Sequence, residues 1–511
     1  MTTRYKLLHF DKEPLLSHVT TQRSFEVASV SSSITWGFEN RMDPKVFRAY
    51  DIRAIVPDLV DRESVYYGRV GDPNTYQAPL EPKDVEIIGK GLAKLFDSPK
   101  VAIGRDARLS SPAWCDALSE GLASQGVDVI QLGITTTDMV YYVSGAWRIP
   151  AVQITASHCT KELNGMKMVR PGAEVIGQGS GMEDLRDIVM KGGFASTQKR
   201  GDITEKDIMP EYIDHLMRFV DVKNIRHFKI IADAGNGCGG LVCRELVKRI
   251  PQIELTEMYF DPDGRFPNHE ANPFEVENIR TLIQRTPAEG ADFGVAWDGD
   301  ADRVYFLDET GKFIPGDFIT ALVASFFLAK RPGEAIVYDI RSSWAVRDWV
   351  LKLGGKPIME RVGHSFIKRT MRRENAVFGG EVSGHYYFRD HFYADNGFIP
   401  LIAILQMLST KSRKMSELIA GLGDYFISGE INSTVPDVEA VMKEIAKTYA
   451  DADDINYLDG ITVNYSDWHF NVRPSANDPV VRLNLEAKSQ EMMERKRDEV
   501  LSIIRGGNRR Q

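Results

Sequence analysis

The chain has 511 residues with 43% hydrophobic and 26% charged content, which predicts a globular protein of three or four domains. Its formal net charge of −9 argues against nucleic-acid and membrane partners, because phosphate-rich surfaces are bound mainly by clustered Lys and Arg. Four cysteines without metal-ligand spacing and the lack of a signal-peptide pattern predict free thiols and a cytoplasmic protein. We therefore expect small-molecule ligands.

Three stretches share one plan: a short apolar strand, a polar loop, an amphipathic helix and a second strand. In chain order these elements are residues 101–104, 106–111, 112–124 and 127–132; then 230–232, 233–237, a helix ending at 249, and 253–259; then 336–339, 341–343, 344–353 and 357–361. Right-handed crossovers place each loop at the carboxyl end of its strand, where open α/β sheets bind ligands. Three such domains are expected to face one cleft.

The fold class predicted from these patterns is α/β, with three similar mixed α/β domains around a central cleft and a smaller C-terminal α+β domain. The apolar runs 318–329 and 397–408 are shorter than the ~20 residues that span a bilayer, so both are expected to be buried helices. After residue 424, strand-like segments at 461–463 and 480–485 accompany helices at 439–450 and 488–504. The expected boundaries are an N-terminal extension at 1–42 and domains at 43–202, 203–312, 313–426 and 427–511.

An acidic loop follows the strand-like residues 293–296. Asp298, Asp300 and Asp302 occupy alternate positions, so their carboxylates point the same way if the backbone stays extended. The small residues between them leave room for the loop to curl around an ion. Carboxylates suit Mg²⁺, and an EF-hand would need a longer loop ending in Glu. An ordinary acidic turn is the alternative.

A second motif, residues 154–160, places Ser157 next to His158 and is followed by Lys167. Adjacent Ser and His residues rarely act as nucleophile and base, and the Gly-x-Ser-x-Gly elbow is missing, so a serine esterase is not expected. Taken alone, a serine in such a motif is more often a turn or helix-cap residue than a nucleophile.

Two further loops carry groups that suit a sugar phosphate. One offers Glu381, Ser383 and His385 between glycines, and alternating donors and acceptors are what neighbouring sugar hydroxyls need. The other, residues 473–479, is a rigid turn that begins with Arg473, whose planar guanidinium suits phosphate oxygens. Each loop by itself is also compatible with a solvated loop or an ordinary hairpin turn.

In this order and spacing, the four motifs resemble the α-D-phosphohexomutase superfamily, and most of all its bacterial phosphomannomutase/phosphoglucomutase members. The resemblance runs from Phe47 to the C-terminus and includes residues 47–53 and 361–368. It implies an intramolecular phosphotransferase that interconverts hexose 1-phosphate and hexose 6-phosphate of mannose and/or glucose. Hexose 1,6-bisphosphate is the implied intermediate and activator. Hexose phosphates are the expected partners, and the chain is expected to be a monomer or homodimer.

The resemblance also implies the roles of individual residues. Ser157 is expected to carry the phosphate and to bind one Mg²⁺ together with Asp298, Asp300 and Asp302. The other expected catalytic residues are Arg53, His158, Lys167, His364 and His385. Lys167 is the favoured base, provided that neighbouring cations lower its pKa. The expected substrate-binding residues are Tyr50, Arg303, Glu381, Ser383, Arg473, Ser475 and Asn477.

The chain departs from the family pattern in two loops and two additions. Cys159-Thr160 stands where Asn-Pro usually follows Ser-His, and Ala54 stands where a Gly is usual. The residues before 42 and the stretch 57–83 look like additions.

Three alternatives to this mutase stay open. Phosphoglucosamine mutase is less favoured because the Glu-x-Ser-Gly-His form of the sugar loop is typical of enzymes for mannose and glucose phosphates. A magnesium-dependent phosphatase would make a phosphate clamp at Arg473 superfluous. A non-catalytic sugar-phosphate sensor is favoured only by Cys159-Thr160 and would not need the acidic loop. If the last domain opens, residues 424–430 are the expected hinge.

Overall fold

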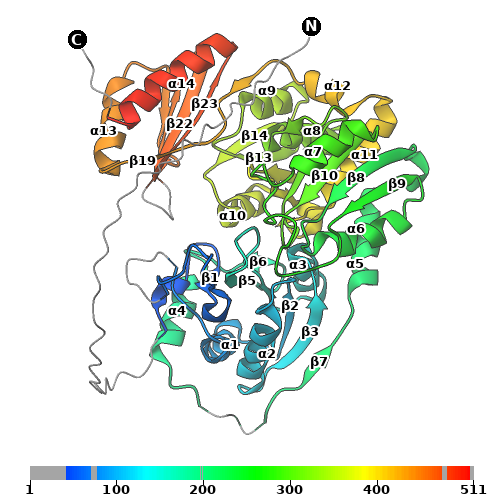
Figure 1. Cartoon of the computed structure of the whole chain (residues 1–511), viewed down its shortest axis with the longest axis vertical. Coiled ribbons are helices and arrows are strands. Elements are labelled where there is room, and N and C mark those ends of the chain that lie inside the picture. Colours follow the sequence, from blue (N-terminus) through cyan, green and yellow to red (C-terminus); the bar gives the residue numbers. More distant parts are fainter. Residues whose placement is uncertain (1–41, 71–76, 196, 198, 475–479, 507–511) are drawn as a thin grey trace, which may run out of the picture. The chain divides into compact units, whose positions relative to one another are not determined.

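Four β-sheets organise the part of the chain that the computed structural model describes, residues 42–70, 77–195, 197, 199–474 and 480–506 (Figure 1). The predicted N-terminal extension lies almost entirely outside these residues. Three of the sheets are mixed and the last is antiparallel, so the predicted fold class is confirmed. Among the described residues, no helix combines the length and the apolar content needed to cross a membrane.

The first sheet has the strand order β1-β5-β4-β2-β3-β7, with β6 paired to β5. Its strands are β1 (Ile52–Ile55), β2 (Lys100–Arg105), β3 (Asp128–Ile134), β4 (Ala151–Ile154), β5 (Leu163–Arg170), β6 (Glu174–Val175) and β7 (Ile203–Glu205). Its helices are α1 (Pro82–Phe96), α2 (Ser111–Ala123), α3 (Thr137–Trp147) and α4 (Met182–Lys191). Because β4 and β5 are antiparallel neighbours, the loop that joins them reverses the chain direction at the carboxyl end of β4.

Helix α1 shows how local sequence sets an element of this domain. Pro82 occupies its first turn, and reciprocal hydrogen bonds between Glu81 and Asp84 form a capping box. Asp97 ends the helix in a left-handed conformation with φ of 46°. The buried positions, which include Val85 and Leu92, recur at helical spacing and pack into the core of the first domain.

The second sheet has the order β12-β11-β10-β8-β9. It contains β8 (Phe228–Asp233), β9 (Ile253–Met258), β10 (Phe293–Trp297), β11 (Val304–Leu307) and β12 (Phe313–Ile314), with helices α5 (Met209–Leu216), α6 (Gly239–Lys248) and α7 (Arg280–Ala288). Strands β10 and β11 form an antiparallel hairpin, and the acidic loop is its turn.

The third sheet has the order β14-β13-β15-β16-β17. It contains β13 (Ala335–Asp339), β14 (Lys356–Glu360), β15 (Phe378–Gly380), β16 (Tyr386–Phe388) and β17 (Ala394–Asp395). Its helices are α8 (Gly316–Lys330), α9 (Trp344–Lys352), α10 (His364–Glu374), α11 (Ile399–Lys411) and α12 (Met415–Ala420). Helices α8 and α11 are largely buried, as the two apolar runs predict.

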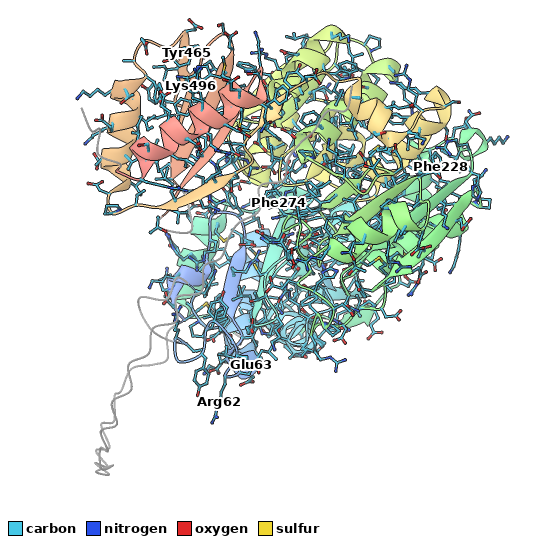
Figure 2. All side chains as sticks on the ribbon, turned by 45° about the horizontal axis from the view of Figure 1, so that its top comes forward. Arg62, Glu63, Phe228, Phe274, Tyr465 and Lys496 are labelled. Carbon is cyan, nitrogen blue, oxygen red and sulfur yellow. The ribbon has the colours of Figure 1, made fainter. Side chains whose placement is uncertain are left out.

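The fourth sheet joins β18-β23-β22-β21-β20, with β19 paired to β23. Its elements are β18 (Phe426–Ile427), β19 (Ile431–Thr434), β20 (Asp454–Asn456), β21 (Ile461–Asn464), β22 (Trp468–Pro474), β23 (Val480–Ala487), α13 (Val438–Thr448) and α14 (Gln490–Ile504). This domain has its own apolar core, against which the partly buried Tyr465 packs; Figure 2 labels Tyr465 and Lys496 in this domain. The ring centre of Tyr465 lies 5.0 Å from that of Trp468, and Lys496 Nζ lies 4.7 Å from the ring centre of Trp468.

The three predicted strand-helix-strand units are all present, and the paired strands of each run parallel. Two of the expected domain boundaries lie just before the last strand of the sheet that they should close. Strand β7 pairs with β3 in the first sheet, and β12 pairs with β11 in the second. Each strand closes the edge of the preceding sheet, because a short extended segment there finds unpaired backbone groups.

Asp317, in the first turn of α8, leads to a prediction about pH. Phe318 N and Ser343 N donate hydrogen bonds to its carboxylate at 3.0 and 2.9 Å, yet burial raises its pKa to about 7. A raised folded-state pKa means that the folded protein holds this proton more tightly than the unfolded chain does. Its contribution to stability is therefore complete below pH of about 4 and is lost as pH rises through about 7.

We expect the melting temperature of the wild type minus that of Asp317→Asn to decrease as the pH rises from 5 to 7.5. The corresponding change in the free energy of unfolding is at most about 1.4 kcal/mol per pH unit. Thermal unfolding of both proteins across this range checks it, with the exposed Asp187→Asn as the control. A constant difference between wild type and Asp317→Asn would contradict the prediction.

Candidate active site

Ser157 lies in the loop between β4 and β5 and is 1% exposed. Its φ of 52° is left-handed, a conformation that costs a non-glycine residue about 1–3 kcal/mol unless the surroundings fix it. Its backbone N–H donates to Thr155 Oγ1 at 2.8 Å. Its hydroxyl donates to Asp298 Oδ2 of the second domain at 2.8 Å. The predicted meeting of the serine with the acidic loop is therefore present in the structure.

The acidic loop gathers three buried carboxylates, but not by staying extended. The residues between β10 and β11 form a turn in which Ala301 is left-handed, with φ of 58°. Asp298, Asp300 and Asp302 each place one oxygen within 4.8 Å of the others. The premise of an extended backbone is therefore wrong, whereas the curl for which the small residues leave room is present: the turn of the β10–β11 hairpin brings the three side chains together.

The charges of this loop are strongly coupled. Burial, with the charges of Asp300 and Asp302, raises the pKa of Asp298 well above its usual range. Burial opposes ionisation of Asp302, but Lys167 and His385 outweigh it and hold its pKa well below the usual range. Within the described chain, Oδ1 of Asp300 and Oδ1 of Asp302 are buried without a hydrogen-bond donor. Such oxygens are suited to a hard cation.

Lys167, from β5, is the cation that meets these carboxylates. Its Nζ lies 2.6 Å from Asp300 Oδ2 and also pairs with Asp302. Burial alone would lower the pKa of Lys167, but the carboxylates of the acidic loop outweigh it and raise the pKa. The condition set for a base, a pKa lowered by neighbouring cations, is not met in this arrangement. The base role of Lys167 stays a prediction.

Thr137, the first residue of α3, is a contact that the sequence reasoning missed. Its hydroxyl donates to Asp300 Oδ2 at 2.6 Å, and its backbone N–H donates to Asp300 O at 3.0 Å. The signal in the sequence is its place after β3, at the same edge of the sheet as the serine loop. A second link is Gly397, whose carbonyl accepts from Trp297 Nε1 at 2.9 Å. A Cβ on Gly397 would lie 2.3 Å from Ala301 O, so this approach requires glycine.

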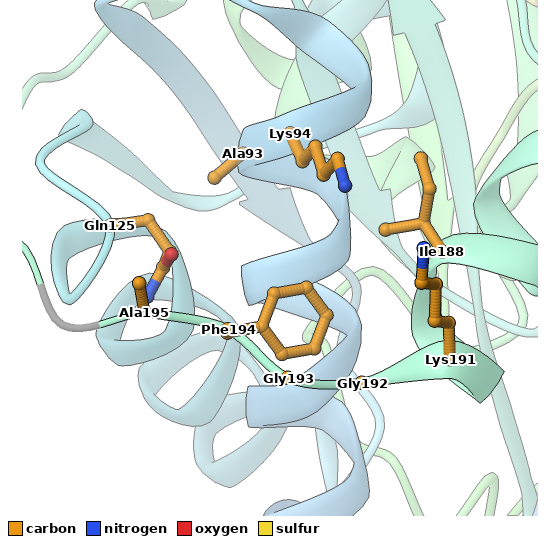
Figure 3. Close-up of a pocket in the computed structure, with 9 residues that line it drawn as sticks. All are labelled: Ala93, Lys94, Gln125, Ile188, Lys191, Gly192, Gly193, Phe194 and Ala195. Carbon is orange, nitrogen blue, oxygen red and sulfur yellow. The ribbon is translucent and has the colours of Figure 1, made fainter.

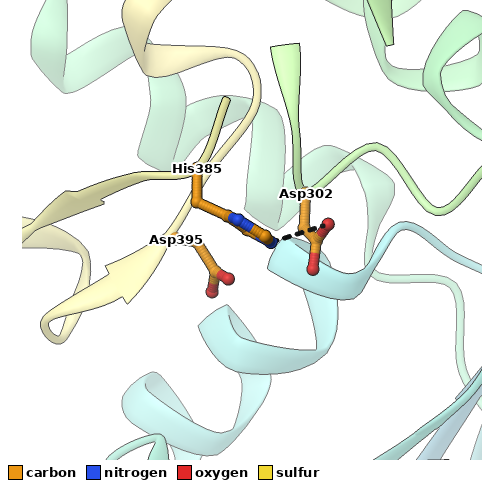
Figure 4. Close-up of side chains that lie close together, drawn as sticks. All are labelled: Asp302, His385 and Asp395. Carbon is orange, nitrogen blue, oxygen red and sulfur yellow. Dashed lines mark ion pairs between the residues drawn. The ribbon is translucent and has the colours of Figure 1, made fainter. Parts of the chain in front are cut away.

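The sugar-loop residues lie between β15 and β16 and face the acidic loop. His385 Nε2 is 3.6 Å from Asp302 Oδ1, and Asp395 of β17 completes a buried group with these two (Figure 4). Ser383 Oγ is 3.2 Å from His385 Nδ1. Glu381 accepts from Gly363 N at 3.0 Å and from the Tyr387 hydroxyl.

Arg303 and the remaining predicted catalytic groups surround the same loops. Arg303 Nε is 3.7 Å from Asp298 Oδ2 and 3.2 Å from His385 Nε2. His158 Nδ1 is 3.4 Å from Ser157 Oγ. Burial and the charges of Arg303 and Arg53 lower the pKa of His158 well below its usual range, so its imidazole is neutral at pH 7.

Arg53 and His364 approach from the first and third domains. Arg53, in β1, donates to Ala156 O at 2.6 Å and to Cys159 Sγ at 2.7 Å. His364 begins α10, and its ring lies 6.4 Å from that of His385 and 5.6 Å from that of Tyr50. Burial, then the charges of Lys368 and His385, lower the pKa of His364 well below its usual range.

The predicted phosphate clamp is described only at its first residue, because Ser475 and Asn477 lie outside the described residues. Arg473, near the end of β22, donates to Glu430 Oε2 at 2.9 Å. Arg341 lies 3.6 Å from the same oxygen and 3.9 Å from Glu381 Oε1, so it connects the clamp to the sugar loop. Arg341 was not among the predicted site residues, although it follows β13 at the edge where the other loops lie.

A cavity of about 470 Å³ lies apart from this constellation (Figure 3). It is lined by parts of α1 and α4, by Gln125 and by residues 192–195, and none of the predicted site residues that the structure describes contributes to it. Its lysines, Lys94 and Lys191, are exposed. We therefore locate the candidate site at the meeting loops of the domains.

Fold and site together define a class: a four-domain α/β protein in which a buried serine of the first domain meets a carboxylate loop of the second. Models of the phosphoglucomutase/phosphomannomutase family match its parts in order. Alpha/beta/alpha domains I, II and III match residues 68–192, 210–311 and 315–425, and the C-terminal domain matches residues 430–503. The chain belongs to the phosphoglucomutase/phosphomannomutase family. The predicted superfamily and the predicted enzyme class, an intramolecular phosphotransferase, are confirmed.

Individual relatives agree with this assignment. The chain is 36% identical over 464 residues to phosphohexose mutases of Xanthomonas campestris pv. campestris, covering 90% of this chain and 99% of the relative. It is 35% identical to a phosphomannomutase of Vibrio cholerae over 90% of this chain and 98% of the relative. The crystal structure of a phosphoglucomutase/phosphomannomutase family protein from Burkholderia thailandensis superposes with a TM-score of 0.78 at 28% identity, over 91% of this chain and 99% of that one.

The contact of Thr137 with Asp300 leads to a prediction about metal binding. Replacing Thr137 with Val removes the hydroxyl that orients this carboxylate, and losing such a support typically weakens metal binding about 10–100-fold. We expect a dissociation constant for Mg²⁺ that is about tenfold higher. Calorimetric titration measures it, and Thr137→Ser, which keeps the hydroxyl, is the matched control. Equal affinities of wild type and Thr137→Val would contradict the prediction.

Proposed function

We propose that the chain interconverts the 1-phosphates and 6-phosphates of mannose and/or glucose, with Ser157 as the phosphate carrier. The observation that supports this most directly is the hydrogen bond of 2.8 Å from Ser157 Oγ to Asp298 Oδ2. It puts a buried hydroxyl of the first domain next to the three carboxylates of the second. A serine used only as a turn residue or helix cap has no need of this cross-domain contact.

The acidic loop fits one Mg²⁺. Asp298, Asp300 and Asp302 offer oxygens within 4.8 Å of one another, and two of their oxygens have no hydrogen-bond donor among the described residues. Oxygen ligands at this spacing suit a hard cation that keeps a position for a phosphate oxygen. When bound there, Mg²⁺ supplies charge neutralisation for the group that is transferred.

The sugar and its non-reacting phosphate are proposed to lie between the third and fourth domains. Glu381 and Ser383 hold sugar hydroxyls, while Arg473, with Ser475 and Asn477, holds the phosphate. The support for this placement is a continuous run of charges from Glu381 through Arg341 and Glu430 to Arg473. A phosphate dianion fits the donors that Glu430 engages, because a phosphate and a carboxylate can each accept two hydrogen bonds from one planar guanidinium group.

In the proposed reaction the phosphoryl group first moves from Ser157 Oγ to the free hydroxyl of a bound hexose phosphate. The O–P bond at Ser157 breaks and a new O–P bond forms at the sugar. The proton of the sugar hydroxyl passes to a side chain of the site, and Ser157 Oγ takes up a proton and becomes a hydroxyl again. Lys167, Arg53, His364 and His385 are the groups present for proton transfer or charge stabilisation. The hexose 1,6-bisphosphate then turns around and returns its other phosphate to Ser157.

Replacing Ser157 with Ala tests this function. Wild type with Mg²⁺, mannose 1-phosphate and a trace of glucose 1,6-bisphosphate is expected to form mannose 6-phosphate without net release of free phosphate. Ser157→Ala removes the oxygen that carries the phosphate, so the rate should fall at least about 10⁴-fold, as with loss of other catalytic nucleophiles. The matched control is Ser409→Ala, whose hydroxyl donates to Leu405 O within α11 and accepts from Arg226 N.

Both products must be measured, because they separate the alternatives. Isomer formation that survives in Ser157→Ala would refute the carrier role. Free phosphate in place of the isomer would indicate a phosphatase, and neither product would indicate a sensor of sugar phosphates. Parallel assays with glucose 1-phosphate and glucosamine 1-phosphate rank the three sugars.

A further inference from the structure

Arg108 is an arginine of the first domain with only 1% of its surface exposed, and no role has been assigned to it above. It lies between β2 and α2. Its guanidinium donates from all three nitrogens, and the contacts are these: Nε to Asp106 Oδ2 at 3.1 Å, Nη1 to Thr160 O at 2.6 Å and Leu163 O at 3.0 Å, and Nη2 to Ser157 O at 2.8 Å and Cys159 O at 2.7 Å.

Four of these five bonds go to backbone carbonyls of one loop, the loop that carries Ser157. Carbonyl oxygens that converge on one point repel each other and, once buried, require donors. A guanidinium presents five N–H groups in a fixed plane, whereas an ammonium group presents three without that plane. Arg108 therefore defines the path of the backbone from Ser157 to Leu163, and the left-handed conformation of Ser157 with it.

Asp106 fixes the guanidinium in turn. Its Oδ1 accepts from Arg108 N at 3.0 Å and from Ser111 Oγ at 2.6 Å, while Oδ2 accepts from Arg108 Nε. Because Asp106 and Ser111 flank the start of α2, the orientation of Arg108 is set by the sheet and helix of the first domain. Because the carbonyl oxygens of the serine loop accept from this guanidinium, its orientation also fixes the position of the serine loop.

Residues of the second domain pack against the Arg108 guanidinium and the backbone around it. The ring of Phe266 lies 5.2 Å from the guanidinium carbon of Arg108. A Cβ on Gly264 would lie 2.4 Å from Ala107 O, so this loop packs directly on the backbone before Arg108. A Cβ on Gly299 would lie 2.6 Å from Ser157 O, the oxygen that Arg108 holds. The Ser157 peptide is thus fixed between Arg108 and the acidic loop.

We propose that Arg108 is a positioning residue for phosphoryl transfer: it holds the backbone of the serine loop so that Ser157 Oγ is aimed at the acidic loop. The proposal rests on the proposed function of Ser157. Among the described residues assigned to the sugar or its phosphate, none contacts Arg108. Its loss should therefore slow the chemical step without weakening substrate binding.

The test compares Arg108→Gln and Arg108→Lys with wild type, each loaded with Mg²⁺, in the mannose 1-phosphate assay. We expect kcat to fall about 100-fold in Arg108→Gln, the effect of misplacing a reacting group by about 1 Å, with KM for the hexose phosphate unchanged. Arg108→Lys should recover only part of the rate. The control is Arg200→Gln, an exposed arginine of the same domain that pairs with Glu120, and it should match wild type.

Two further readouts separate positioning from general stability. Added guanidinium ion at millimolar concentration should restore part of the rate of Arg108→Ala, because it supplies the missing planar donor. Hydrogen exchange in Arg108→Gln should increase in residues 155–165, while protection of α1 and α4 stays at the wild-type level.

Three outcomes would overturn the proposal while wild type is active: an unchanged kcat in Arg108→Gln, a rise in KM that accounts for the loss, or loss of exchange protection throughout the first domain. The last outcome, without guanidinium rescue, would show that Arg108 only stabilises the fold. A wild type that forms no hexose 6-phosphate would instead overturn the proposed function, so the two failures are distinguishable.

Discussion

The hydrogen bond from Ser157 Oγ to Asp298 Oδ2 is the contact on which the site depends, because it joins the first two domains at buried, charged groups. Three buried carboxylates in one turn are unfavourable unless cations meet them. Arg303 comes from the acidic loop itself, but Lys167 comes from the first domain. Separating these domains would leave charges of both signs without partners. Removing one partner of a buried pair costs about 3–5 kcal/mol, so the loops are held in register by the same charges that suit a metal.

Each loop of the site follows from where its sheet ends or turns. The serine loop joins antiparallel strands of the first sheet, the acidic loop is a hairpin turn of the second, and the sugar loop joins β15 and β16 of the third. Rigid strands on both sides limit how far these loops can move. The close approach of Gly397 to Ala301 O of the acidic loop adds a connection from the third domain. The site is therefore formed by short loops on well-packed strands, an arrangement that keeps reacting groups in place.

The sequence predicted the fold from local patterns of apolar and polar residues, and the family resemblance predicted which site residues lie close together. Apolar periodicity predicted the three parallel units and the buried helices α8 and α11. The family resemblance that the four motifs carry implied that Ser157 would lie next to the acidic loop. The geometry of that loop was not predictable, because alternation of Asp residues does not reveal the left-handed Ala301. Contacts between distant residues, such as Thr137 with Asp300 and Arg108 with Ser157, were also out of reach, since each partner alone is an ordinary polar residue.

The apolar cores show how the molecule divides mechanically. One apolar core contains side chains of the first three domains, from Ala102 to Leu422, and the first domain adds a second core around α1. The fourth domain has a separate core from Val435 to Ile504. Polar and stacking contacts, such as Trp344 on His469 and Asp459 on Val362 N, connect the fourth domain to the third. Bending of the fourth domain away from the third would break these contacts while the two apolar cores stayed packed, so the predicted opening of the last domain does not require exposing either core.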